Sequence, residues 1–167
     1  MPYQPRGPYV FQSGRRAGKT VEHFMFEDYG FLTWFLYGMN RESNGQKNVL
    51  HQHLEWVLRR GENRKTKMIC PQCRVRTVKF FSVLYGYGHD DFSVDLHYTC
   101  CENGGCREIL RGMALGERPV FMPFRFSQLT NFERGDRRRI AELFKEVFEI
   151  PKPLTRGAVF QFFNEDV

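Results

Sequence analysis

The sequence predicts an α+β protein: a helical N-terminal module beside a four-cysteine zinc β-ribbon, with a C-terminal helix and a short strand. Apolar residues recur at helical spacing in residues 46–60 and again near the C-terminus. Residues 75–85 and 92–99 are instead rich in β-branched and aromatic side chains, which favour strands. Cysteines stand just before the first of these stretches and just after the second. Helices and strands thus occupy separate parts of the chain, as in α+β folds.

The N-terminal part is expected to be helical after an irregular arm. Residues 1–8 contain three prolines, which disfavour regular structure. Asp28 is placed to cap a helix that ends near Gly38. Residues 46–60 form the clearest amphipathic helix, and Gly61 is placed to end it.

The cysteine region is expected to be a β-ribbon. Residues 75–85 and 92–99 should pair as a hairpin around a glycine-rich turn at residues 86–90. Residues 108–113 should return as a third strand.

The C-terminal part is expected to hold one helix and one strand. The helix should end at Ile150 and begin either at Thr130 or at Asp136. Residues 158–163 should form the final strand. The expected parts are residues 1–62 as the helical module with its basic glycine turn, residues 63–115 as the zinc ribbon, and residues 116–167 as a C-terminal helix and tail that pack on the core.

The cysteine spacing predicts one structural Zn²⁺. Cys70 and Cys73 are separated by two residues, so both sulfurs can approach one ion from a tight turn. A glycine-containing turn before Cys106 supplies the second half of the site. The spacing leaves open whether Cys100 or Cys101 is the fourth ligand, and we predict Cys101. A redox role for the first pair is disfavoured, because a helix N-terminus is expected after such a motif and a strand is predicted here.

Positive charge is concentrated before and around the first cysteine pair. The chain carries a net charge of +6, and residues 59–79 alone hold eight basic residues and one acidic residue. Such a concentration is what a phosphate-binding surface needs, although a solvated linker would have the same composition. The candidate nucleic-acid-binding residues are Arg15, Arg16, Lys19, Arg64, Lys65, Lys67, Arg74, Arg76 and Lys79.

Residues 11–36 resemble a small module that follows exodeoxyribonuclease X-type exonuclease domains and also occurs in stand-alone bacterial and phage proteins. The matching residues are Phe11, Gly14, Gly18, Lys19, Asp28, Gly30, Leu32 and Trp34, whereas Arg15 and Phe31 depart from the usual lysine and tyrosine. Residues 54–58 also look like the closing helix of that module. The resemblance implies association with nucleic-acid enzymes but no catalysis, since the nuclease carboxylates of those proteins belong to another domain.

The cysteine region resembles the zinc ribbons of phage transcription activators and topoisomerase C-terminal regions. In both, a Cys-Pro-x-Cys knuckle like that at residues 70–73 faces a second cysteine pair after an aromatic strand like residues 97–99.

These observations predict a cytoplasmic zinc-ribbon protein that binds nucleic acid as an accessory subunit of a DNA or RNA processing complex. Single-stranded DNA or RNA is favoured over sequence-specific duplex binding, because Arg74, Arg76 and Lys79 would contact phosphates while nearby aromatic residues such as Phe80 are available to stack on bases. The alternative is a protein-interaction subunit of a nucleoprotein or transcription assembly. An enzyme is not expected: the candidate groups His89, Asp90, Asp91, Asp95 and His97 cluster at a turn, where acidic residues are common. No apolar run is long enough for a membrane span.

Overall fold

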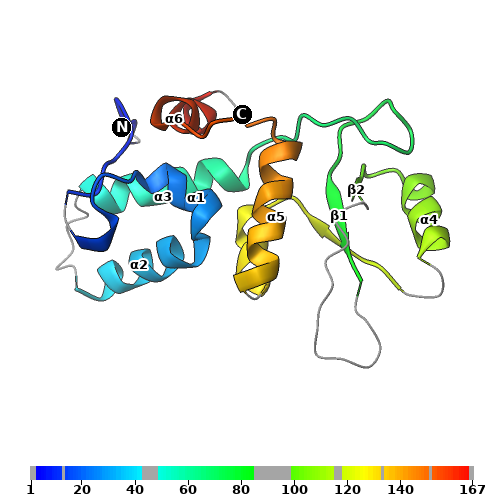
Figure 1. Cartoon of the computed structure of the whole chain (residues 1–167), viewed down its shortest axis with the longest axis horizontal. Coiled ribbons are helices and arrows are strands. Elements are labelled where there is room, and N and C mark those ends of the chain that lie inside the picture. Colours follow the sequence, from blue (N-terminus) through cyan, green and yellow to red (C-terminus); the bar gives the residue numbers. More distant parts are fainter. Residues whose placement is uncertain are drawn as a thin grey trace. The chain divides into compact units, whose positions relative to one another are not determined.

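The computed structural model describes residues 3–12, 14–42, 49–84, 99–114, 118–132, 134–150 and 152–165 (Figure 1). Contacts divide the chain into two compact units. Unit 1 comprises Met1–Arg64, Arg125–Thr130 and Ile150–Val167, and unit 2 comprises Lys65–Phe124 and Asn131–Glu149. The residues from 116 onward, expected to form one C-terminal part, therefore contribute to both units.

Unit 1 is helical, as its sequence predicts. It contains the 3₁₀ turn η1 (Gly14–Arg16) and the helices α1 (Val21–Glu27), α2 (Tyr29–Glu42), α3 (Val49–Glu62) and α6 (Arg156–Asn164). Helix α1 contacts the other three helices, and α3 also contacts α2 and α6. A further 3₁₀ turn, η2 (Phe126–Asn131), adds buried Phe126 to this core, where its ring meets Phe26 and Phe163.

Asp28 separates α1 from α2. Its backbone N–H donates to the Phe24 carbonyl at 2.9 Å, and its Oδ1 accepts from the backbone N–H of Phe31 at 3.2 Å. One residue thus ends the first helix and caps the second, which confirms the predicted start of a helix at Asp28. Helix α2 continues to Glu42, beyond its predicted end near Gly38. Residues 46–48, the expected start of the next helix, lie outside the described residues.

Residues 158–163 were expected to form a strand, and this prediction is wrong. They belong to α6, whose N-cap Thr155 accepts from the Ala158 N–H at 3.2 Å. The buried residues of α6 are Val159, Phe162 and Phe163, at the spacing of one helical face. An alternating strand would bury every second residue instead.

Unit 2 is built on a three-stranded antiparallel sheet. Its strands are β1 (Phe80–Val83), β2 (Thr99–Cys100) and β3 (Val120–Pro123), in the order β2-β1-β3. The register pairs Phe80 with Cys100 and Phe81 with Met122. The unit also contains the helices α4 (Gly104–Met113) and α5 (Arg134–Val147).

The two faces of the sheet pack against different helices. Phe81 meets Phe144 of α5 with 6.0 Å between ring centroids. Successive side chains of a strand point to opposite faces, so Phe80 faces the other way. There the guanidinium carbon of Arg107, on α4, lies 4.6 Å from the centre of the Phe80 ring. The sheet therefore lies between α5 and α4 (Figure 1).

Two expected strands of the cysteine region are wrong in part or in whole. The strand expected over residues 75–85 begins only at Phe80, as β1. Residues 75–79 are not part of it, because residues 70–77 form a tight loop. Residues 108–113 are helical: Asn103 caps α4 by accepting from the Gly105 N–H at 2.8 Å, and α4 buries Cys106 and Leu110, four residues apart. Residues 85–98, with most of the expected hairpin, lie outside the described residues.

Candidate metal centre

Cys70 and Cys73 lie on a loop closed by two backbone hydrogen bonds. The Cys70 N–H donates to the Arg76 carbonyl at 2.7 Å, and the Arg74 N–H donates to the Cys70 carbonyl at 2.8 Å. Arg74 has a positive φ of 54°, which turns the chain sharply after the second cysteine. The loop thus brings two sulfurs separated by two residues to the same side.

Cys101 and Cys106 come from the junction between β2 and α4. Cys101 follows the last residue of β2, and Cys106 lies in the first turn of α4. The Asn103 cap fixes the start of that helix. Arg107 also stabilises the junction. Its Nη2 donates to the Glu102 carbonyl at 3.0 Å, and its guanidinium lies over the Phe80 ring.

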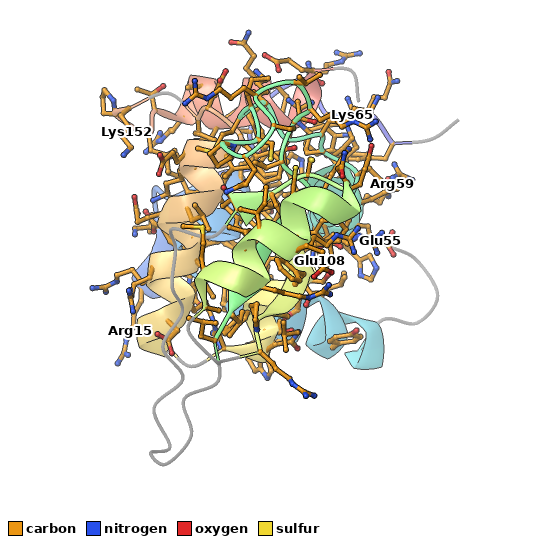
Figure 2. The ribbon with its side chains drawn as sticks, turned by 90° about the vertical axis from the view of Figure 1, so that its right-hand side faces the viewer. Arg15, Glu55, Arg59, Lys65, Glu108 and Lys152 are labelled. Carbon is orange, nitrogen blue, oxygen red and sulfur yellow. The ribbon has the colours of Figure 1, made fainter. Side chains whose placement is uncertain are left out.

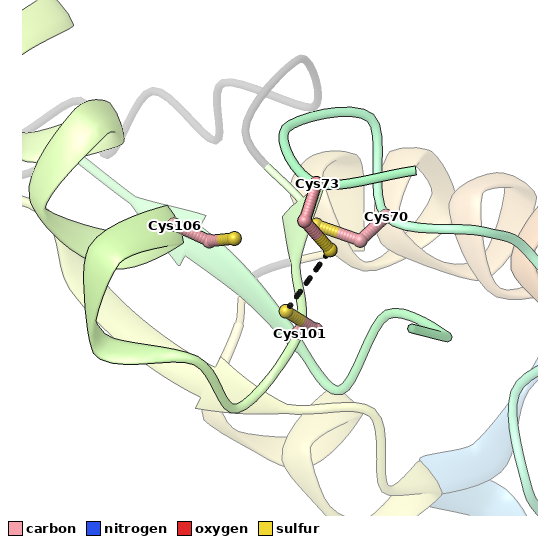
Figure 3. Close-up of side chains that lie close together, drawn as sticks. All are labelled: Cys70, Cys73, Cys101 and Cys106. Atoms are coloured by element: carbon pink, nitrogen blue, oxygen red, sulfur yellow. Dashed lines mark hydrogen bonds between the residues drawn. The ribbon is translucent and has the colours of Figure 1, made fainter. Parts of the chain in front are cut away.

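The four sulfurs of Cys70, Cys73, Cys101 and Cys106 converge (Figure 3). All lie within 4.8 Å of one another, and those of Cys73 and Cys101 are 3.8 Å apart. Tetrahedral coordination with bonds of about 2.3 Å places ligand sulfurs about 3.8 Å apart. The spacing therefore fits a metal ion bound by four thiolates, and the cluster could hold such an ion.

Cys100 is not a member of this cluster. It lies within β2, opposite Phe80 in the sheet, and is fully buried. Burial raises the pKa of the Cys100 thiol to about 12, so at neutral pH it is a protonated thiol. The structure thus distinguishes two adjacent cysteines whose sequence spacing is equally compatible with metal binding.

The electrostatics of the cluster are uneven. Hydrogen bonds from the backbone N–H groups of Arg76 and Val75 lower the pKa of Cys73 to about 6 and thereby favour its thiolate. Burial and the neighbouring thiols raise the pKa of Cys106 to about 12, and burial likewise raises the pKa of Cys101. A bound divalent cation favours the thiolate of every ligand. The donor set therefore fits a cation that compensates for buried negative charge.

The basic candidates of unit 1 are largely engaged within the fold. Arg16 pairs with Asp28 at 3.1 Å, and Lys19 pairs with Glu27 at 2.6 Å. Arg64 is buried; its Nη2 lies 2.9 Å from a carboxylate oxygen of Glu165, and its guanidinium covers the Phe162 ring at 4.5 Å. Arg15 is exposed.

The basic candidates of unit 2 surround the cysteine loop. Lys65, Lys67, Arg74 and Arg76 are exposed, and Lys79 is half-buried. Arg76 forms an exposed ion pair with Glu102, with 3.5 Å between Nη1 and Oε1. Because exposed pairs of this kind contribute little, the Arg76 side chain remains available to an external anion.

Sequence reasoning missed the residues that hold the second half of the site. Arg107 was not singled out, and Asn103 was expected only to make the turn flexible, yet both fix the turn that presents Cys106. The signal was present: an asparagine directly before Gly104 has the position of an N-cap. The tyrosines at 85 and 87 and the acidic and histidine groups at 89–97 lie outside the described residues.

Comparison with protein-family models, with curated proteins and with solved structures finds no match to this chain. Among the described residues, no helix is both long enough and apolar enough to cross a membrane.

Proposed function

We propose that this chain is a nucleic-acid-binding protein whose second unit folds around a structural Zn²⁺. The convergence of four thiols on one point carries the proposal. Four sulfur donors in a tetrahedral arrangement are typical of Zn²⁺ sites that are closed to substrate. The ion would tie the cysteine loop to the first turn of α4. Its role would be to stabilise this part of the fold.

Nucleic-acid binding is supported by the charges displayed on the same loop. Arg74 and Arg76 flank an exposed turn immediately after Cys73, and Lys65 and Lys67 are exposed just before it. A metal-stiffened loop would hold these cations in place, so little conformational entropy would be lost when phosphates bind. The function proposed is therefore electrostatic binding to a nucleic-acid backbone, as an accessory part of a DNA or RNA processing complex.

The test compares single-stranded DNA, duplex DNA and single-stranded RNA by fluorescence anisotropy at several salt concentrations. Counterion release should make log K fall with log salt, with a slope of about −0.7 per phosphate contact on single strands. Replacing Arg74, Arg76 and Lys79 together by alanine should flatten the slope by about two units if all three contact phosphate.

A charge-matched control separates a specific surface from general charge. The triple variant Arg118→Ala, Arg138→Ala, Arg139→Ala removes three other exposed cations from unit 2 and should leave the slope nearly unchanged. Zinc content must stay equal in all variants, so that unfolding is not mistaken for lost contacts. Absence of binding to every nucleic acid at low salt would reject the proposal.

The second candidate is a protein-interaction subunit, which one observation favours. Among the described residues of unit 2, four apolar side chains are exposed by more than half: Ile69, Val75, Ile109 and Met113. Apolar surface of this kind often marks a protein interface. If nucleic acid does not bind, the basic loop and these side chains would together fit an acidic, partly apolar protein surface.

A further inference from the structure

Helix α2 displays two large aromatic side chains to solvent. Trp34 is 69% exposed and Tyr37 is 70% exposed. They are three residues apart, so they are neighbours on one side of the helix. The other tryptophan, Trp56, is only 5% exposed. Burying aromatic rings is favourable, so two that remain in water on the same side of a helix indicate a binding surface.

Trp34 adjoins a group of aromatic contacts that begins at the basic turn η1. The guanidinium carbon of Arg16 lies 3.4 Å from the centre of the Phe31 ring, which is a cation–π contact. The Phe31 ring in turn lies 6.4 Å from the Trp34 ring. Phe31, Trp34 and Tyr37 follow one another at intervals of three residues, which form a ridge along a helix. Positive charge and aromatic surface thus adjoin in unit 1.

Arg15 adds a further cation to the η1 turn. It is exposed and extends away from the ribbon (Figure 2), whereas its neighbour Arg16 is held by Phe31 and Asp28. The turn that carries both arginines follows Gly14, whose φ is +75°. Asp28 and Glu27 offset the charges of Arg16 and Lys19, whereas Arg15 is exposed to solvent. Unit 1 as a whole holds 12 basic and 8 acidic residues.

We infer that Trp34 and Tyr37 form a stacking surface for the bases of a single-stranded nucleic acid, with the η1 turn contacting its phosphates. This inference rests on the proposed function and assigns a second contact surface, on unit 1, to the same ligand. Aromatic rings beside basic side chains are the usual means of binding single strands without sequence readout. A duplex keeps its bases paired and stacked, so it offers no base faces to these rings. The basic turn favours an anionic polymer over a neutral apolar partner.

Tryptophan fluorescence tests the inference directly, because Trp56 is buried and Trp34 is not. Adding oligo(dT) or oligo(U) should quench the Trp34 emission, whereas a duplex of the same length should quench it much less. Trp34→Phe should abolish the quenching and still bind, because a phenyl ring also stacks. Trp34→Ala combined with Tyr37→Ala should weaken single-strand binding at least about tenfold, since stacking contributes substantially for each base.

Salt dependence separates stacking from phosphate contacts. The double aromatic variant should bind more weakly at every salt concentration with an unchanged slope, whereas Arg15→Ala should flatten the slope by about 0.7. Val120→Ala, which removes an exposed apolar side chain from β3 in unit 2, is the control and should change neither quantity.

The outcomes distinguish this inference from the proposed function. If the double aromatic variant binds like the wild type while the Arg74/Arg76/Lys79 variant is weakened, the stacking surface is refuted and the proposed function stands. If the wild type binds no nucleic acid, both fail. If the wild type instead dimerises in sedimentation equilibrium and the double aromatic variant does not, the ridge is an interface between two copies and the inference is overturned.

Discussion

The sulfur atoms of Cys73 and Cys101 are 3.8 Å apart, although the two residues are separated by 28 positions in the sequence. One sulfur is presented by a loop closed by hydrogen bonds, and the other by the end of a strand. No disulfide joins them, since both are free thiols. Two separate local structures therefore converge at the distance that a tetrahedral ion requires.

Substituting Cys100 and Cys101 one at a time should show which of the two binds the proposed zinc ion. Cys101→Ser should lose most of the bound zinc, because only three thiolates remain, whereas Cys100→Ser should keep close to one zinc per chain. Elemental analysis of the purified proteins gives the answer. The opposite pattern would show that Cys100 is the ligand and that the arrangement of sulfurs described above is wrong.

Zinc affinity should fall as the pH is lowered. Cys101 and Cys106 have raised pKa values, so in the metal-free protein both thiols are protonated at neutral pH and must release their protons when zinc binds. Between pH 8 and 6, log K should therefore rise with pH with a slope of at least about 2. The pKa of Cys73 is lowered to about 6, so that thiol adds to the slope only near pH 6 and below.

Competition with a chromophoric chelator of known proton affinity measures this dependence. Unfolding monitored by near-UV circular dichroism should accompany metal loss, because the metal would supply folding free energy to unit 2. An affinity that does not change between pH 8 and 6 would exclude binding by initially protonated thiols.

The first half of the cysteine cluster was predictable from sequence because a Cys-x-x-Cys pair constrains its own loop. Which of Cys100 and Cys101 joins the cluster was not predictable, because this depends on where β2 ends and on which of the two side chains the sheet buries. Helix α4 was mistaken for a strand because Ile109 and Leu110 favour either state, and its cap at Asn103 outweighs that preference. The strand predicted at 158–163 was wrong for a similar reason. The Thr155 cap and the burial of Phe162 and Phe163 on one face favour a helix there.

The surroundings of individual basic residues were less predictable than the cysteine cluster. Arg64 belongs to the most basic stretch of the sequence, yet it is buried against Phe162 and paired with Glu165. Its partners are about a hundred positions away in the chain, so no local pattern could reveal them. Charge density in a sequence indicates a surface only where tertiary contacts leave the side chains exposed.

A buried hydrogen-bond network should make Glu22 important for the stability of unit 1. Glu22 and His53 are 0% and 1% exposed at their side chains, and Glu22 Oε1 lies 2.7 Å from His53 Nε2. The other ring nitrogen of His53 lies 3.0 Å from the Tyr3 hydroxyl. Glu22→Leu should destabilise the fold by about 2–4 kcal/mol, because it leaves the His53 nitrogen buried without its acceptor.

Chemical denaturation measures the effect, and a second carboxylate of α1 provides the control. Glu27 forms an exposed pair with Lys19, so Glu27→Gln should change stability by less than about 1 kcal/mol. Adding His53→Leu to Glu22→Leu should cost less than the sum of the single effects, since both partners are then removed. Equal effects of Glu22→Leu and Glu27→Gln would show that the buried pair does not stabilise the protein.

Gly61 should disfavour even a methyl side chain, although it lies within a helix where alanine is normally preferred. A Cβ atom at this position would lie 2.5 Å from Met25 Cε and 3.1 Å from Phe126 Cδ2. Gly61→Ala should therefore destabilise the fold by about 1–3 kcal/mol through overpacking. Gly38, in the interior of α2, has no atom within 4 Å of its would-be Cβ, so Gly38→Ala should stabilise the fold by about 0.5–1 kcal/mol. Thermal denaturation should thus shift in opposite directions for the two variants. A higher melting temperature for Gly61→Ala would mean that α1, α3 and η2 pack less closely than the structure describes.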